Sequence, residues 1–271
     1  MGLDAPCALV VGLYALSCHL VRFASISYLR KHPLAAFQAK DINAFPNRVV
    51  ASINALLIGG SAILYLAPRV TLGFGQEGGF VTFPAADMTA MTRVQEVSCD
   101  CMMGYMLYDT YWYLFEKRGN IELDLLLHHL LGLASWLTVR HTGAGALYMM
   151  WVHMAELSTP LLHASWLLFK LKRQDTALFY LTSRGTILAF MLFRVGSIFL
   201  CLCHMYTHGA LVFRASELGS GVQYGQAAVM LAFWALNITW LSLLLRMAAT
   251  DEIRETEDKY KDPTKDNKKK A

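Results

Sequence analysis

The chain has 271 residues, of which 55% are hydrophobic and only 16% are charged, and its mean hydropathy is +0.38. So much apolar surface excludes an ordinary soluble domain and indicates a polytopic membrane protein. The net charge of +4 does not call for a nucleic-acid partner, because the basic residues gather in links and in the tail, as they do on the cytosolic side of membrane proteins.

Seven apolar runs are each long enough to cross a bilayer as a helix, which takes about 20 residues. They cover, in chain order, residues 6–29, 49–67, 97–115, 121–139, 143–169, 177–205 and 221–247. The sequence therefore predicts an all-α polytopic membrane protein with seven transmembrane helices. We divide it into a leading helix with its cytosolic link (1–46), a bundle of six helices (47–249) and a charged tail (250–271).

Basic residues in the links give the expected orientation, because Lys and Arg resist translocation. They gather after the first, third and fifth predicted helices, so we expect a lumenal N-terminus and a cytosolic tail. The tail ends in Lys268, Lys269, Lys270 and Ala271. Lysines three and four places from a cytosolic C-terminus form a dilysine signal, which coat proteins read for retrieval to the endoplasmic reticulum. The alternative is a merely basic tail.

Six cysteines include two close pairs, Cys99 with Cys101 and Cys201 with Cys203, near the expected lumenal ends of two helices. A disulfide or a metal site is one interpretation, and packing as small apolar side chains is the favoured one. We expect no bound metal and no resident cofactor. A glycosylation sequon at Asn237 lies within the last predicted helix, out of reach of the transferase.

Ionisable side chains inside the apolar runs are the strongest functional signal. Each costs roughly 3 kcal/mol or more in hydrocarbon, so such groups usually face a protein interior or a wet cavity. The candidate site residues are Asp109, Asp124, His128, His129, His153, Glu156 and Arg194. We expect them to converge on one enclosed chamber.

The aspartate and histidines of the helix at 121–139 are closely spaced. Asp124 and His128 are four residues apart and therefore share one face of the helix. The carboxylate could hold the imidazole in one tautomer, which is the arrangement that a general base needs. His129 points about 100° away, toward other partners. Because the link at 117–120 is very short, Asp109 and His128 are expected at one depth in antiparallel neighbours.

Glu156 and Arg194 lie near the middle of their predicted helices, too deep to reach water easily. We expect them to neutralise each other or Asp109. Pro160 lacks the amide proton that would bond the carbonyl of Glu156, so a kink and a free acceptor are predicted there. Arg194 and His153 are assigned to lipid binding or to structural pairing between helices, which is the alternative for the other ionic groups as well.

Four stretches hold most of these residues: GYMLYDTYW at 104–112, LLLHHLLGLASW at 125–136, AELSTPLLHASWLL at 155–168 and FRVGSIF at 193–199. Together they resemble the TLC domain, the six-helix membrane module shared by ceramide synthases, translocon-associated TRAM proteins and less characterised TLC domain-containing proteins. The resemblance runs from Asn47 to about Arg246. Ceramide synthases pair the two histidines with two downstream aspartates, at positions that Glu156 and Thr159 occupy in this chain. The resemblance is therefore closest to the TLC domain-containing group.

Two functions are expected from these residues and this resemblance. The first is an endoplasmic-reticulum membrane protein that binds or handles acyl lipids and contributes to membrane lipid homeostasis. The second is a ceramide-synthase-like N-acyltransferase, in which His128 or His129 takes the proton from a long-chain amine as it attacks an acyl-CoA thioester. Asp124 or Asp109 would orient the imidazole, and Glu156 would replace an aspartate.

The partners implied are membrane lipids, with acyl-CoA as a possible co-substrate, and the sequence gives no oligomeric state. A third class, a seven-helix receptor or ion translocator, matches the number of helices and the buried charges. Retinal chemistry would need a lysine within a helix to form a Schiff base, and the predicted spans have none near their centres.

Overall fold

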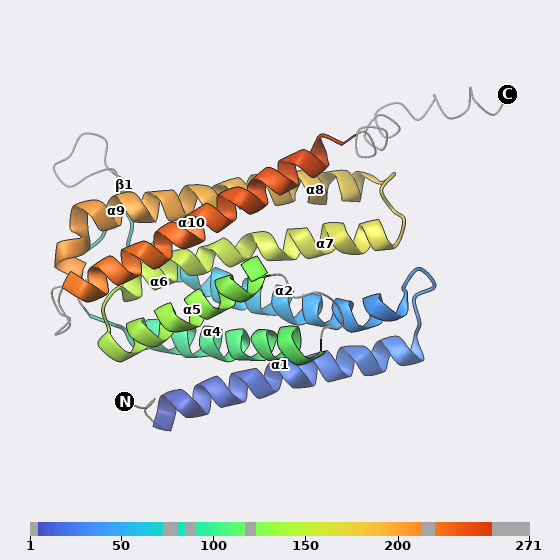
Figure 1. Ribbon diagram of the computed structural model, residues 1–271, viewed down its shortest axis with the longest axis horizontal. Coiled ribbons are helices and arrows are strands. Elements are labelled where there is room, and N and C mark those ends of the chain that lie inside the picture. The colour runs from blue at the N-terminus through green and yellow to red at the C-terminus, as the bar shows by residue number, and fades with distance from the viewer. Residues whose placement is uncertain (1–4, 73–80, 85–89, 117–122, 213–219, 251–271) are drawn as a thin grey trace.

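The computed structural model describes residues 5–72, 81–84, 90–116, 123–212 and 220–250, and in these ranges the chain is a bundle of helices (Figure 1). The first half contributes α1 (Ala5–Lys31), α2 (Ala39–Leu66), α4 (Arg93–Tyr111) and α5 (Leu123–Thr142). The second half contributes α6 (Ala146–His153), α7 (Thr159–Lys170), α8 (Ala177–Ala189), α9 (Ser197–Val212) and α10 (Ser220–Ala248). A short antiparallel pair, β1 (Thr71–Leu72) and β2 (Val81–Thr82), follows α2, with Thr71 opposite Thr82.

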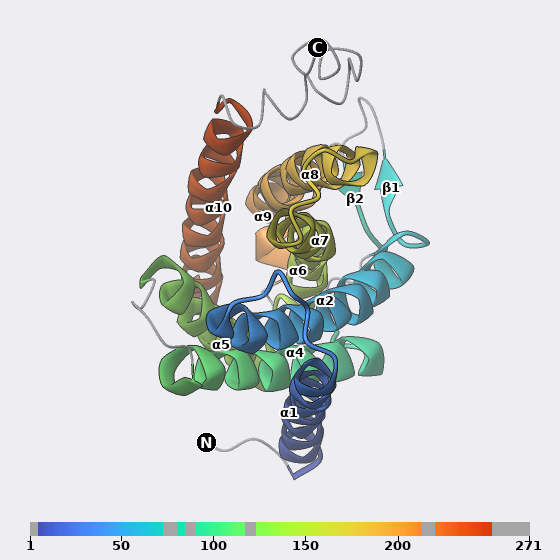
Figure 2. The same ribbon diagram turned by 90° about the vertical axis from the view of Figure 1, so that its right-hand side faces the viewer.

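Seen along the bundle, α6 and α7 lie in the centre, between α2 on one side and α8 and α9 on the other (Figure 2). The pair α4 and α1 extends the bundle beyond α2, with α1 outermost. The long α10 crosses the other helices obliquely and contacts α5 and α9. The central position of α6 and α7 places the residues around Glu156 inside the protein.

Each of the seven predicted ranges is helical over most of its described residues, with residues 67 and 143–145 outside the helices. Four of the described helices are long and apolar enough to span a membrane: Ala5–Lys31, Asp41–Leu66, Ala177–Gly209 and Gly221–Ala248. The chain is therefore a polytopic helical membrane protein. Membrane crossing by the segments at 97–115, 121–139 and 143–169 stays a prediction. These segments hold most of the ionisable residues, which is why composition alone does not identify them as spans.

The predicted cytosolic links that follow α1 and α7 lie at one end of the bundle (Figure 1). The helices α1, α7 and α10 end there, and α2 and α8 begin there. This alternation agrees with the predicted order of crossings. The basic residues of the link at 117–120 and the dilysine signal at 268–269 lie outside the described residues. The orientation in the membrane therefore stays a prediction.

One predicted boundary is wrong: α2 begins at Ala39, ten residues before the predicted apolar run at 49–67. The backbone amide of Gln38 donates to Asp41 Oδ2 (3.0 Å), and Lys170 Nζ lies 2.9 Å from Asp41 Oδ1. Hydrophobicity does not reveal this start because the first turns are polar and are held by these contacts. The extension makes Asn47 a helical residue that faces α4.

Three irregular turns replace regular α-helix beside ionisable residues. η1 (Trp112–Glu116) is a π-helical turn that follows Asp109, and η3 (Phe190–Gly196) is a π-helical turn that contains Arg194. η2 (Met154–Ser158) is a 3₁₀ turn that contains Glu156. Turns of these kinds inside helices frequently mark functional sites.

Regular α-helix is interrupted just before Pro160, where the 3₁₀ turn η2 precedes α7. It lies in the first turn of α7, where proline is tolerated because no intrahelical amide is needed. The predicted free acceptor is wrong, since the Thr159 amide donates to the carbonyl of Glu156. In the 3₁₀ turn the donor is the amide three residues after Glu156 and not four. Thr159 therefore donates to the Glu156 carbonyl, to which Pro160 has no amide proton to donate.

Close packing of α1 on α4 fixes the outer helix. Cys7 Sγ donates to Asp100 Oδ1 (3.0 Å), and Arg140 Nε of α5 donates to the same oxygen (2.9 Å). The six cysteines, all among the described residues, form no disulfide, and Cys99 and Cys201 are fully buried, which favours the packing interpretation. Gly104 lets the two backbones approach, because a Cβ there would lie 2.6 Å from the carbonyl oxygen of Val11.

Gly104→Ala is therefore expected to force α1 away from α4 and to lower the free energy of unfolding by about 1–3 kcal/mol, as overpacking does. Gly12→Ala on α1 is the matched control, since a Cβ at Gly12 meets nothing within 4 Å. Thermal unfolding of the purified variants in detergent measures both. Equal unfolding temperatures for the two variants would contradict this packing.

Candidate functional site

Polar side chains from α2, α4, α5, η2, η3 and α10 meet in the interior of the bundle. They form two clusters, one around Asp109 and the other around Arg194, with His128 lining a hollow beside them. The predicted convergence on one chamber is found for His128, His153 and Glu156, which line the same hollow. Asp109 with His129 and Arg194 with Glu156 form the two clusters. Asp124 lies outside both clusters and the hollow.

Asp109 is the centre of the first cluster and is buried. Its Oδ1 accepts from Asn47 Nδ2 (2.7 Å), and its Oδ2 accepts from the Tyr105 hydroxyl (3.4 Å). His129 Nε2 lies 3.2 Å from the same Oδ2. The Tyr108 hydroxyl donates to Asn47 Oδ1 (2.7 Å), which orients the amide toward the carboxylate. The carboxylate is therefore held by three side chains from α2, α4 and α5.

His129 is committed to protein partners at both ring nitrogens. Nε2 faces Asp109, and Nδ1 lies 3.3 Å from the Thr110 hydroxyl. Its side chain is only 4% exposed. An imidazole that is held in this way stabilises a buried carboxylate and has no nitrogen left for a ligand.

Arg194 is the centre of the second cluster. Its Nε donates to Ser158 Oγ (2.8 Å), its Nη2 to Thr159 Oγ1 (3.0 Å) and its Nη1 to Asn237 Oδ1 (3.4 Å). Nη2 also lies 3.7 Å from Glu156 Oε2, which accepts from the Thr159 hydroxyl at 3.3 Å. The expected pairing of Glu156 with Arg194 is present in the structure. The guanidinium spreads its donors over four side chains, as its fork of five N–H groups allows.

His128 differs from its neighbour. Its ring packs edge-on against Phe233 and Trp240 of α10, at centroid distances of 5.0 and 5.4 Å. Its Nδ1 is buried and, among the described residues, has no hydrogen-bond partner. A buried polar atom without a partner is uncommon and calls for an explanation, such as a missing ligand or water.

A small hollow lies against this imidazole. Its lining includes Glu156 and Asn237 of the second cluster, together with His153, Phe233 and Met106. His128, with its unpartnered Nδ1, therefore borders one space with Glu156 and Asn237. A polar group in that space would supply the hydrogen bond that Nδ1 lacks.

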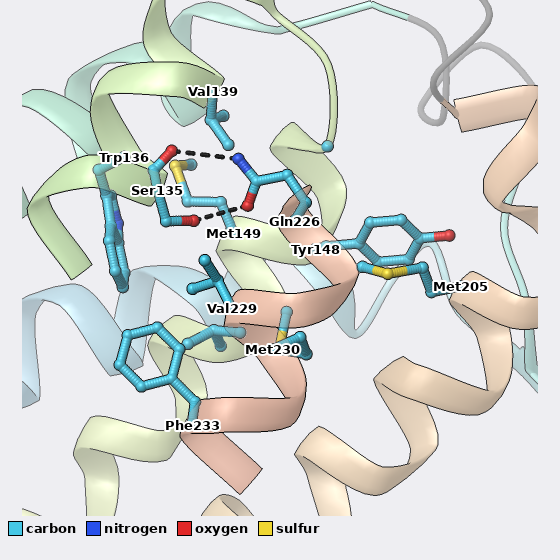
Figure 3. A pocket seen from close by; sticks show the side chains of 12 residues that line it. Ser135, Trp136, Val139, Tyr148, Met149, Met205, Gln226, Val229, Met230 and Phe233 are labelled. Carbon is cyan, nitrogen blue, oxygen red and sulfur yellow. Dashed lines mark hydrogen bonds between the residues drawn. The ribbon is translucent and has the colours of Figure 1, made fainter. Parts of the chain in front are cut away.

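An apolar hollow adjoins the first and continues toward the opposite end of α5 and α10. Trp136, Val152 and Phe233 line both hollows. At the far end, Ser135 Oγ donates to Gln226 Oε1 (2.7 Å) and Gln226 Nε2 donates to the Ser135 carbonyl (3.4 Å), which ties α5 to α10 (Figure 3). The two hollows together offer a polar end beside His128 and an apolar continuation.

The predicted pairing of Asp124 with His128 is wrong. Asp124 is exposed, and its Oδ2 accepts from Trp240 Nε1 (2.7 Å). Within the described residues, the carboxylate–imidazole pair is Asp109 with His129. The reason is tertiary: α4 and α10 lie on different faces of α5, and each offers a closer partner than the next turn of the same helix.

His153 is a structural residue. It is fully buried, and its Nε2 accepts from Trp136 Nε1 at 2.6 Å, while Ser98 Oγ lies 3.0 Å from Nδ1. The acceptor role of Nε2 places the proton of the neutral ring on Nδ1, which donates to Ser98. Of its two predicted roles, the structure supports the structural one, with neutral partners in place of charges.

Sequence reasoning missed the uncharged members of the clusters. They are Asn47, Tyr105, Tyr108, Ser158 and Asn237. Asn237 was noted only as a sequon, although it is 2% exposed and binds Arg194. The position of Asn237 inside an apolar run could have revealed its role. Polar side chains in membrane helices usually form hydrogen bonds to a neighbouring helix.

The family model of the TLC domain matches residues 44–246 of the chain. The match begins within α2 and ends within α10, so it includes both clusters and His128 and leaves out α1. Searches of curated proteins and of solved structures gave no significant match.

The two neighbouring histidines are expected to differ in their effect on stability. His129→Ala leaves the buried carboxylate of Asp109 without its imidazole, whereas His128→Ala removes ring packing alone. We expect His129→Ala to lower the free energy of unfolding by about 2 kcal/mol or more beyond His128→Ala, because stranding a buried charge is costly. Unfolding in mixed detergent measures the difference. Equal losses would mean that the Asp109–His129 pair contributes nothing to the fold.

Proposed function

The chain belongs to the TLC domain family, and from this premise we propose that it binds acyl lipids within its bundle, in the membrane of the endoplasmic reticulum, and so contributes to membrane lipid homeostasis. The observation that carries the proposal is His128. Its Nδ1 is buried without a partner among the described residues, and the residue lines a hollow that adjoins an apolar one. The proposed location in the endoplasmic reticulum is supported by the dilysine sequence of the tail.

An acyl lipid has the two kinds of surface that the hollows offer. A hydroxyl, amine or amide of a head group would supply the hydrogen bond that His128 lacks, beside Glu156 and Asn237. The acyl chain would extend between Trp136 and Phe233 toward Met230. Lipid sites of this kind are mostly apolar, with a few polar groups that fix orientation. The hollows are narrow, so binding requires these side chains and α10 to move outward.

The direct test compares cellular lipids after deletion of the protein, after re-expression of the wild type, and after re-expression of His128→Ala. We expect deletion to change the abundance of acyl lipids, the wild type to restore it, and His128→Ala to restore little of it. His141→Ala is the matched control, because this exposed histidine lies on the same helix, outside both hollows.

Two results together would end the proposal. The first is a lipid profile that deletion leaves unchanged. The second is purified protein that retains no acyl lipid by native mass spectrometry.

A second candidate function is N-acyl transfer, and the free imidazole of His128 is the observation that favours it. The nitrogen of a long-chain amine would attack the carbonyl carbon of an acyl-CoA thioester. His128 would take the amine proton as the carbon–nitrogen bond forms. The carbon–sulfur bond would then break, and the CoA thiolate would take that proton from His128 and leave as the thiol. The sequence left the base open between the two histidines; here His128 is the base, and His129 stays bound to Asp109. Glu156 would stand beside the reacting amine.

Purified protein supplied with acyl-CoA and a sphingoid amine tests this function. If the chain is a transferase, amide forms, and His128→Ala slows its formation about 100-fold or more, the usual contribution of a general base. His141→Ala should retain the activity. The absence of amide with any chain length, from protein that still binds lipid, would leave the binding function and exclude the catalytic one.

A further inference from the structure

A hollow on the described surface lies away from both clusters, at the end of α1. It is formed by one face of α1, the link that follows it and the start of α2. Its lining includes Ala24 and Tyr28 of α1, His32 and Leu34 of the link, and Phe45 of α2. Its volume is about 520 Å³. Ligand sites occupy about 300–1,000 Å³, so this groove has room for a ligand.

The walls of the groove are apolar and aromatic, and they are uncovered. Tyr28 is 64% exposed and Leu34 is 38% exposed. The His32 ring packs against Tyr28, with centroids 4.7 Å apart, and brings a titratable nitrogen-bearing ring to the open end. The α1 residues of the lining form two neighbouring rows with a spacing of four, Ala24 with Tyr28 and Ser25 with Leu29, and so lie on a single face of the helix.

The end of the groove carries positive charge. Arg30, Lys31 and His32 are consecutive, and Arg30 and Lys31 make no ion pair with any described residue. The nearby acidic groups are already engaged, since Glu116 pairs with Arg22 and Asp41 with Lys170. A ligand with an anionic group would therefore meet uncompensated basic side chains.

Helical geometry separates the two unpaired cations. At 100° per residue, Lys31 flanks the face that carries Tyr28, whereas Arg30 points to the opposite side of α1. The charge at the groove therefore comes from Lys31, and the His32 ring adds polar nitrogens. Arg30 carries the same charge one residue away and outside the groove, which makes it a natural control.

We propose that this groove binds one anionic phospholipid from the leaflet at the end of the bundle where α1, α7 and α10 finish (Figure 1). The acyl chain lies along Ala24 and Tyr28, and the phosphate faces Lys31 and His32. Basic side chains beside a membrane helix attract anionic lipids, and a tyrosine at this level suits the membrane interface. Apart from Phe45, the residues that line the site lie before the matched family region, and none of them lines the central hollows.

The test uses the full-length protein, equilibrated with equal amounts of phosphatidylserine and phosphatidylcholine that have the same acyl chains. Native mass spectrometry counts the lipids retained. We expect preferential retention of phosphatidylserine. Lys31→Gln should reduce it about fivefold, the usual effect of one basic residue at a membrane surface, and Arg30→Gln should leave it unchanged.

A second pair of variants tests the groove without changing charge. Ala24→Trp fills the groove and should reduce the retained phosphatidylserine at least as much as Lys31→Gln. Ala8→Trp places the same ring on an exposed position at the other end of α1 and should retain the wild-type level. Unchanged unfolding temperatures show that each variant is folded.

Three results would overturn the proposal. Equal retention of both phospholipids would remove the anionic preference. Equal effects of Lys31→Gln and Arg30→Gln would indicate diffuse attraction to the surface. Loss of the phosphatidylserine in His128→Ala, with retention in Ala24→Trp, would place the lipid in the central hollow. That last result would support the proposed function while excluding this site, so the two proposals fail separately.

Discussion

The cost of an ionic side chain inside a membrane is the constraint on which the interior of this protein depends. Arg194 meets it with oxygen partners from η2, α7 and α10. Because those partners come from three elements, the guanidinium cannot be satisfied until the helices are packed together. The irregular turns serve the same end: η2 carries Ser158 and Glu156, and η3 carries Arg194. The departures from regular helix thus position polar groups that a bilayer would not solvate.

His128 differs from the centres of the two clusters beside it and is therefore the informative residue of the site. Asp109 and Arg194 are surrounded by partners, whereas His128 Nδ1 is buried with none in the described part of the chain. The fold holds the imidazole in place by aromatic contacts with Phe233 and Trp240. Two bonded clusters beside a buried nitrogen without a partner are the arrangement of a binding site, in which the ligand completes the hydrogen bonds.

The sequence was sufficient for the helices and for the charged members of the clusters, because apolar length and isolated charges are both local signals. It indicated the pairing of Glu156 with Arg194 but could not assign the partners of the two histidines. Asp124 and His128 share a helix face, yet Asp124 binds Trp240, and the imidazole that meets a carboxylate is His129. Which histidine faces α4 depends on how α5 is rotated in the bundle, and spacing does not contain that information. Asn47 was missed because its helix begins in polar residues.

The central claim is that an acyl chain occupies the space between α5 and α10 next to His128. A phospholipid with a photoreactive diazirine in its acyl chain tests it most directly, through the peptides that it labels in the full-length protein. We expect label on Phe233 and Met230, which line the hollows, and loss of that label when excess unlabelled lipid competes. Label confined to outward-facing residues such as Leu130 and Leu231, which are 52% and 54% exposed, would contradict the claim.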